Sequence, residues 1–359
     1  MSIGYAGGFK ETADQVVALE RAGLDQVWIA EAYSFDAISQ VGYLAAMTDT
    51  IEIATGILNV YSRTAALMAM TAAGCDYVSG GRFILGLGAS GPQVVEGFHG
   101  VPYDKPMQRI REYIESCRMI WKREEKFHYD GRTVQVPLPE GHGTGLGKPL
   151  KLINHPVRPN IPIWWASLKG LSVAATAELA DGWLPIFFVP ERFRQVWGAQ
   201  LDAGLARRDP SLGRLDIAAG GMLAIGEHLV GEARTKLLDL ARPQLALYVG
   251  GMGAKGKNFY NDICREYGYE READAGAGPV PGRQEGRGCG GASRRMAGAR
   301  QPRRPTRVDQ GAHRRLSPGG RHRALGDAGE RGPGPRGGTA PLPARRVAVA
   351  TRACAGGLL

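Results

Sequence analysis

The chain has 359 residues, of which 43% are hydrophobic, so it can build the core of one large domain or of two ordinary ones. No apolar run reaches the roughly 18 residues of a membrane span, and residues 1–25 lack the order of a secretory signal, so we expect a cytoplasmic protein. The five cysteines and seven histidines show no CxxC or HExxH spacing, which argues against a disulfide framework and a metal site.

The net charge of +10 is unevenly distributed along the chain. The segment 274–359 holds 17 Arg, no Lys and five acidic residues, whereas residues 1–273 carry 28 basic and 30 acidic residues. Gly, Arg, Ala and Pro make up 59 of the 86 residues of this segment, and aromatic residues are absent from it. Such a composition cannot bury enough apolar surface to offset the entropy of ordering, so we expect the segment to be largely disordered.

Two explanations compete for the segment 274–359. An Arg/Gly-rich tail can bind nucleic acid through charge and Arg stacking, but such tails usually include Lys or repeat an RGG unit. Gly, Ala, Pro and Arg are also the residues that a GC-rich gene encodes when it is read out of frame. We favour a frameshift near Ala273, and we therefore expect nucleic acid to be an unlikely partner of the nearly neutral body.

Residues 1–273 alternate short apolar strands with helical stretches. The predicted strands are 2–5, 25–30, 51–57, 82–88, 161–166, 182–188 and 215–225. The predicted helices are 11–22, 36–47, 65–78, 107–121, 171–180, 191–206 and 232–246. The strands show little period-2 alternation, which is typical of parallel strands covered on both faces.

Seven strand-helix units in order predict an α/β fold, namely a (β/α)8 TIM barrel whose eighth strand is missing from the body; a doubly wound open sheet is the alternative. The domain division is then a barrel over 1–273 and a tail over 274–359. Residues 124–160 form a long Gly- and Pro-rich insertion between the fourth helix and the fifth strand. Loops of this length usually bind ligands or act as lids.

The run from Gly86 to Gly91 fits GxGxxG after a strand, but the nicotinamide interpretation is weak. The motif lies on the fourth unit, no acidic residue ends the next strand, and residues 92–100 have the composition of a loop. A structural turn remains possible. We favour a barrel loop that contacts a different cofactor, and its candidate residues are Ala89, Ser90, Gly91 and Gln93.

Two further strand ends carry candidate binding residues. The third strand ends in Thr55, Gly56 and Ile57, where glycine permits a bulge or the close approach of a ligand. The fifth strand leads through Ser167, Leu168, Lys169 and Gly170 into a helix. Free amides at a helix start, beside a hydroxyl and a lysine, can bind phosphate, although an N-terminus without a ligand is the alternative.

Glu31 and Asp36 follow the second strand. Side chains at the carboxyl ends of barrel strands line the active site, so Glu31 is a candidate for binding a cofactor or moving protons. For Asp36, a helix cap or a solvated surface position is the simpler interpretation.

Taken together, these segments resemble the luciferase-like monooxygenase superfamily. The similar runs are EAYSFDAISQVGYLAA, TGILNVYSRTAALMAMTAA, GRFILGLGASGPQVVEGFHGVPYDKP, TGLGKPLKLINHPVR and AELADGWLPIFF. The resemblance covers residues 2–273 and is closest to oxidoreductases that use the deazaflavin coenzyme F420. It implies a cis peptide bond between Gly56 and Ile57 behind the deazaflavin ring, and a phosphate site at Ser167 to Gly170.

The resemblance also implies a function. We expect hydride transfer between F420 and a small organic substrate in a homodimeric enzyme, with an FMN-dependent monooxygenase as the alternative. Relatives that carry Asp-His after the second strand use the histidine as base; this chain has Glu31, Ala32 and Tyr33, so Glu31 or Tyr33 is the candidate replacement. An inactive product of a frameshifted gene and an Arg-rich nucleic-acid binder are the remaining alternatives, and the altered C-terminus is expected to impair activity.

Overall fold

The computed structural model describes residues 1–3, 8–222, 225–251, 258–276 and 349–351. The expectation of disorder in the tail therefore lies mostly outside the described residues. None of the helices in these ranges has the length and apolar character needed to cross a bilayer.

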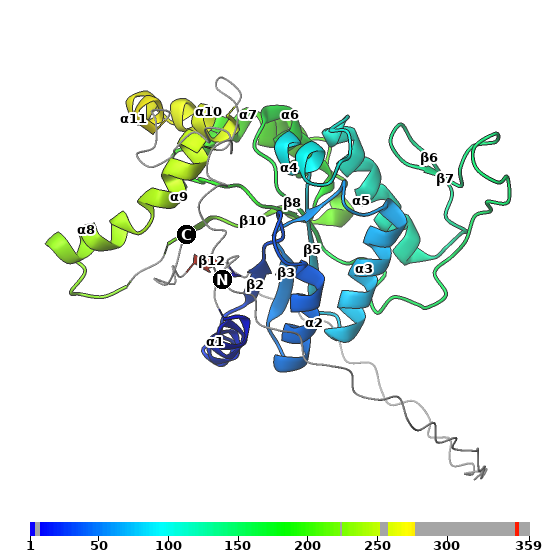
Figure 1. Ribbon diagram of the computed structural model, residues 1–359, viewed down its shortest axis with the longest axis horizontal. Helices are drawn as coiled ribbons and strands as arrows, with labels where there is room; N and C mark the ends of the chain where they lie inside the picture. The colour runs from blue at the N-terminus through cyan, green and yellow to red at the C-terminus, as the bar shows by residue number, and fades with distance from the viewer. Residues whose placement is uncertain (4–7, 223–224, 252–257, 277–348, 352–359) are drawn as a thin grey trace, which may run out of the picture. The chain divides into compact units, whose positions relative to one another are not determined.

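A curved parallel sheet forms the centre of the described fold, with helices outside it (Figure 1). Its strands pair in the order β1, β2, β3, β5, β8, β9 and β10, and β4 continues β3 along β5. The bounds are β1 (Ser2–Ile3), β2 (Gln26–Ile29), β3 (Glu52–Thr55), β4 (Leu58–Asn59), β5 (Phe83–Gly88), β8 (Ile163–Trp165), β9 (Gly182–Trp183) and β10 (Asp216–Ile217). Sequence neighbours thus pair through helical crossovers, which confirms the predicted barrel-type fold.

The helices lie close to the predicted ranges. They are α1 (Phe9–Arg21), α2 (Ala37–Met47), α3 (Ala65–Val78), α5 (Pro106–Lys122), α6 (Gly170–Leu179), α7 (Phe193–Leu205), α8 (Gly231–Asp239), α9 (Arg242–Ala246), α10 (Phe259–Glu266) and α11 (Glu270–Gly276). The helix predicted over 232–246 is divided into α8 and α9. Trp121 of α5 is buried and its Nε1 donates to the carbonyl of Ala69 at 2.9 Å, which fixes α5 against α3.

Three local predictions were wrong. Residues 92–97 form α4 (Pro92–Gly97) rather than a loop, because proline is well suited to the first helical turn. The strand predicted over 182–188 ends at Trp183, since Pro185 lacks an amide proton and Phe187 has a φ of +54°. The strand predicted over 215–225 is interrupted between β10 and β11 (Gly220–Met222).

The insertion 124–160 contains a short hairpin of β6 (Tyr129–Asp130) and β7 (Gln135–Val136). The buried carboxylate of Glu112, on α5, fixes the turn between β6 and β7. It accepts hydrogen bonds from the backbone amides of Arg132, Thr133 and Val134 at 2.7–2.8 Å, and from the side chain of Gln108 at 2.8 Å. Glu112 thus anchors the hairpin to α5, and Arg158 at the end of the insertion pairs with the buried Asp76 of α3.

The last described strand, β12 (Val349–Thr351), comes from the C-terminal segment. It pairs in parallel with β11, with Gly220 opposite Val349. It overlaps residues 346–350, the one stretch of the tail with an apolar strand-like pattern. The main sheet itself ends at β10 within the described part of the body.

Candidate functional site

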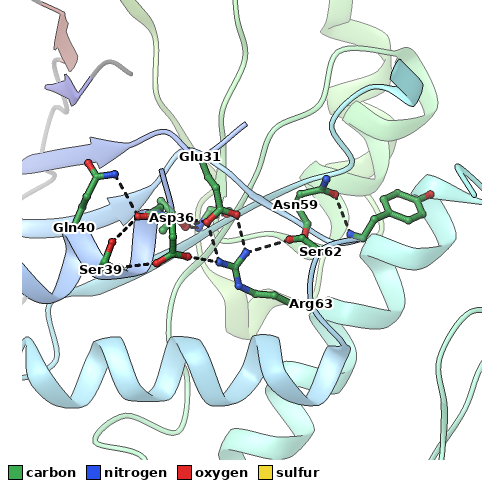
Figure 2. A network of polar contacts seen from close by, with 11 residues as sticks. Glu31, Asp36, Ser39, Gln40, Asn59, Ser62 and Arg63 are labelled. Atoms are coloured by element: carbon green, nitrogen blue, oxygen red, sulfur yellow. Dashed lines mark hydrogen bonds and ion pairs between the residues drawn. The ribbon is translucent and has the colours of Figure 1, made fainter. Parts of the chain in front are cut away.

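Glu31 lies two residues after the end of β2 and forms a charged cluster with Arg63 and Asp36 (Figure 2). Arg63 donates to both carboxylate oxygens of Glu31, at 2.7 and 2.9 Å, and to Asp36 at 2.9 Å. The amide of Ala37 donates to Glu31 at 3.1 Å, and the Asp36 carboxylate accepts from Ser39 N at 2.9 Å as the cap of α2. The capping interpretation of Asp36 is confirmed.

This cluster is held tightly. The Glu31 and Arg63 side chains are 11% and 12% exposed, and hydrogen bonding to Glu31 raises the pKa of Arg63 above its ordinary value. Two-pronged guanidinium-carboxylate contacts are strong and directional. A carboxylate occupied on both oxygens has little freedom to accept a proton from a substrate, so the geometry favours Glu31 as a group that fixes the loops after β2 and β4.

Tyr33 has a different environment. Its side chain is 61% exposed, its ring centroid lies 6.3 Å from that of Phe98, and its hydroxyl has no hydrogen-bond partner within the described ranges. Phe98 in turn packs edge-on against His99 at 5.3 Å. The loops after β2 and β5 thus bring aromatic rings together at the carboxyl end of the sheet.

The predicted strand-three bulge is present between β3 and β4, and the Gly56–Ile57 peptide bond is cis as predicted. Thr55 is fully buried; its hydroxyl donates to the carbonyl of Gly86 at 3.1 Å and accepts from its amide at 3.0 Å. This hydroxyl therefore joins two strands. Ile57 is half-buried beside Gly88.

The first two glycines of GxGxxG lie inside β5, and packing explains both. A Cβ on Gly86 would lie 1.7 Å from the carbonyl oxygen of Thr55. A Cβ on Gly88 would lie 2.8 Å from Ile57 Cδ1 and 3.7 Å from Ala166 Cβ. The absent side chain of Gly88 thus lets the bulge and the end of β8 meet in one apolar wall.

The residues after β5 form the start of α4. Ser90 has a φ of +58°, and its carbonyl accepts from the Tyr103 hydroxyl at 3.3 Å. The carbonyl of Gly91 accepts from two amides of α4, at 3.0 Å each. Ala89 packs against the main core, whereas Gln93 is exposed on α4. Backbone at Ala89 and Ser90 therefore lies closer to the strand end than the Gln93 side chain.

The predicted phosphate site lies at the start of α6. Lys169 precedes the helix and provides no side-chain cap for it. The Ser167 hydroxyl is buried and paired with Thr176 at 2.7 Å, and the Leu168 carbonyl accepts from Trp197 at 3.0 Å. Lys169 Nζ lies 2.6 Å from Asp262, in a pair about half exposed. The backbone from Gly170 onward thus remains the part of this segment suited to an anion.

Two residues labelled in Figure 2 were not singled out from the sequence. Arg63 and Asn59 lie in the run after the third strand, and both are prominent in Figure 2. The available signal was their position, because polar residues directly after a barrel strand lie at the end that carries active sites. Their partners could not be identified without the fold.

Comparisons with known proteins show the family to which this chain belongs. Residues 1–296 match the family model described as luciferase-like monooxygenase. A Mycobacterium tuberculosis protein, whose name assigns it provisionally to the coenzyme F420-dependent oxidoreductases, is 40% identical over 276 residues, which are 76% of this chain and 78% of that protein. A 5,10-methylenetetrahydromethanopterin reductase of Archaeoglobus fulgidus is 30% identical and covers 65% of this chain and 64% of its own.

Among solved structures, the F420-dependent tetrahydromethanopterin reductase of Methanopyrus kandleri matches with a TM-score of 0.59 and 21% identity, and the match covers 76% of each chain. That similarity concerns the fold. With the family model and the 40% identical relative, it leads to one conclusion: the chain belongs to the luciferase-like monooxygenase family.

Proposed function

We propose that this protein is an oxidoreductase that transfers a hydride between coenzyme F420 and a small organic substrate. The observation that carries the proposal is the joint placement of the apolar wall at Ile57 and Gly88 and of the uncapped start of α6, both at the carboxyl ends of parallel strands. The first suits a flat ring, and the second suits a phosphate. The name of the 40% identical mycobacterial relative, which refers to coenzyme F420, supports F420 over FMN.

The residues of the proposed site would have separate roles in binding F420 and in moving a proton. F420, when bound, supplies the hydride chemistry at its ring. Ile57 and the backbone of Gly56, Ala89 and Ser90 would position the ring, and Gly170 amides would bind the phosphate. Glu31 and Arg63 would hold the surrounding loops in place. Tyr33, whose hydroxyl is free of described partners, is then the better candidate for moving a proton to or from the substrate.

Equilibrium binding tests the cofactor assignment. The purified 359-residue chain is titrated with F420 and, separately, with FMN, and the fraction of each bound is measured by fluorescence. We expect retention of F420 and weaker binding of FMN. Preferred binding of FMN would favour the oxygen-activating monooxygenase instead.

We also propose a homodimer formed through α2 and α3. Their outward faces expose Tyr43, Met47, Leu67, Met70, Tyr77 and Val78. Neither helix exposes a charge, because the one charged residue in their sequences, Asp76, is fully buried against Arg158. Exposed apolar side chains on neighbouring helices are typical of an interface, and a face without charge meets its own copy without repulsion.

Light scattering tests the dimer. Met70→Glu should convert a dimer to a monomer, whereas Leu205→Glu, on another exposed apolar residue on α7, should leave the molar mass unchanged. A monomeric parent protein, or a dimeric Met70→Glu variant, would contradict this interface.

For the domain division, we propose that the barrel domain occupies residues 1–273 and that residues 274–359 are read out of frame. The composition of the tail supports this proposal, whereas the match to the family model extends past the boundary, to residue 296. Resequencing the gene across codon 273 tests it. A confirmed reading frame would make the tail an evolved segment.

A further inference from the structure

Asn59, at the end of β4, carries a buried hydrogen-bond donor that its surroundings leave unused. The residue is 5% exposed, and its Oδ1 accepts from the amide of Tyr61 at 2.9 Å. Its Nδ2 is buried and has no partner within the described ranges. Figure 2 shows the oxygen engaged with the backbone and no contact drawn to the nitrogen.

The orientation of this amide follows from its one contact. The Tyr61 backbone N–H is a donor, so the atom that receives it must be the oxygen, and the NH2 group must face the other way. The turn after β4 uses the carbonyl of Asn59 as well, which accepts from the Ser62 hydroxyl at 2.9 Å. Nothing in this turn requires an NH2 group, since Asp or Ser at the same position would supply the side-chain acceptor.

The position of Asn59 connects the unused donor to the proposed cofactor site. Asn59 pairs in register with Gly88 of β5, and it lies two residues after Ile57. Gly88 is also where Ile57 and Ala166 come together. Asn59 therefore lies beside Gly88, at the strand end where the apolar wall proposed to face the ring is formed.

Other buried polar atoms without partners occupy less suitable places. Gln26 begins β2, at the end of the sheet opposite the site, and Trp28 lies inside β2, before its carboxyl end. Three further residues, Arg109, Ser116 and Arg118, lie on α5. His99 lies in the loop after α4 and is only partly buried. Among these residues, Asn59 alone combines deep burial, a fixed orientation and a place at the carboxyl end of a strand.

We propose that Asn59 is a cofactor-binding residue whose Nδ2 donates a hydrogen bond to an oxygen or nitrogen acceptor on the edge of the deazaflavin ring. The inference rests on the proposed function, because it takes F420 as the ligand. A buried amide gains from such a partner, since an unmade hydrogen bond leaves its desolvation uncompensated. The contact would also fix the orientation of the ring against Ile57.

Two substitutions separate this role from a structural one. Asn59→Asp and Asn59→Ser both keep an oxygen for the Tyr61 amide, and both remove the NH2 donor. Gln135→Glu, an exposed amide-to-acid change in the insertion hairpin, is the matched control. The measurements are thermal unfolding of the full chain and fluorescence titration with F420.

We expect F420 binding about 3- to 10-fold weaker in Asn59→Ser, and weaker by at least about tenfold in Asn59→Asp, where an acceptor replaces the donor. Unfolding of Asn59→Ser should remain close to that of the parent, and Gln135→Glu should bind normally. Unchanged affinity in both Asn59 variants would overturn the inference, as would loss of the fold in both. A parent protein that does not bind F420 would instead overturn the proposed function.

Discussion

The two charged contacts near the candidate site differ in burial and therefore in what they do. Glu31 and Arg63 are 11% and 12% exposed and form a two-pronged pair, whereas Lys169 and Asp262 are 49% and 43% exposed and meet through one contact. Loss of one partner from a buried pair leaves an uncompensated charge, whereas an exposed pair contributes little to stability. The first pair maintains the loops around the proposed ring site, and the second is weak enough for a bound anion to compete with Asp262 for Lys169.

The largest expected effect follows from breaking the buried pair. Arg63→Met should lower the free energy of unfolding by about 3–5 kcal/mol, because Glu31 then remains buried without its cation. Urea unfolding measures this change. Arg194→Met, which breaks an exposed pair with Asp202, is the control and should change stability by less than about 1 kcal/mol. Equal effects of the two substitutions would remove the distinction between the pairs.

A smaller effect is expected where a buried carboxylate has only neutral partners. Glu112 is 1% exposed; burial alone would raise its pKa, but hydrogen bonds from Thr133, Gln108 and the backbone of Arg132 outweigh this and lower the pKa below its ordinary value. Glu112→Gln should destabilise the protein by about 1–3 kcal/mol, because it turns one acceptor into a donor facing donors. Limited proteolysis should also cleave the insertion faster.

The pH dependence of this effect has a definite sign. Because the pKa of Glu112 is lower in the folded state, its stabilisation is complete above the unfolded pKa of about 4.3 and is lost as the pH falls through the folded value. The stability difference between the parent and Glu112→Gln should therefore shrink as the pH falls from about 5 through the unfolded pKa and on through the lower folded pKa. A difference that stays constant over this range would contradict the assigned role.

The smallest effect on stability is expected at the exposed pair. Lys169→Glu should change the free energy of unfolding by no more than about 1 kcal/mol, yet weaken F420 binding by placing an anion beside the start of α6. Arg194→Glu alters the net charge equally and should leave F420 binding unchanged. Unaltered affinity in Lys169→Glu would remove this lysine from the phosphate site.

How far the sequence predicts this fold depends on the range of the interactions involved. Both ends of α3 coincide with the predicted helix, since its apolar pattern and the Thr64 cap are local. The bulge at Gly56 and Ile57 was predicted through family resemblance. The length of β9 and the helix at 92–97 were missed. Pro185 ends a strand and Pro92 starts a helix, and only the fold shows which of these a given proline does.

The candidate site was less predictable for a physical reason. Glu31 was identified from its position after a strand, but its pairing with Arg63 spans 32 residues and exists only when the loops after β2 and β4 are brought together. The free NH2 group of Asn59 is likewise visible only after the neighbouring backbone is placed. Sequence position thus indicates which residues reach the site, whereas the fold determines which of their atoms remain available to a ligand.

Hydrogen exchange with and without F420 tests the central claim most directly, because it reports both parts of the proposed site in one experiment. We predict that bound F420 slows exchange of the amides around Ile57 and, together with them, of the amides at the start of α6 from Gly170. The exposed helix α8 should exchange at the same rate in both states. Protection confined to one of the two segments, or absent from both while F420 is bound, would contradict the account.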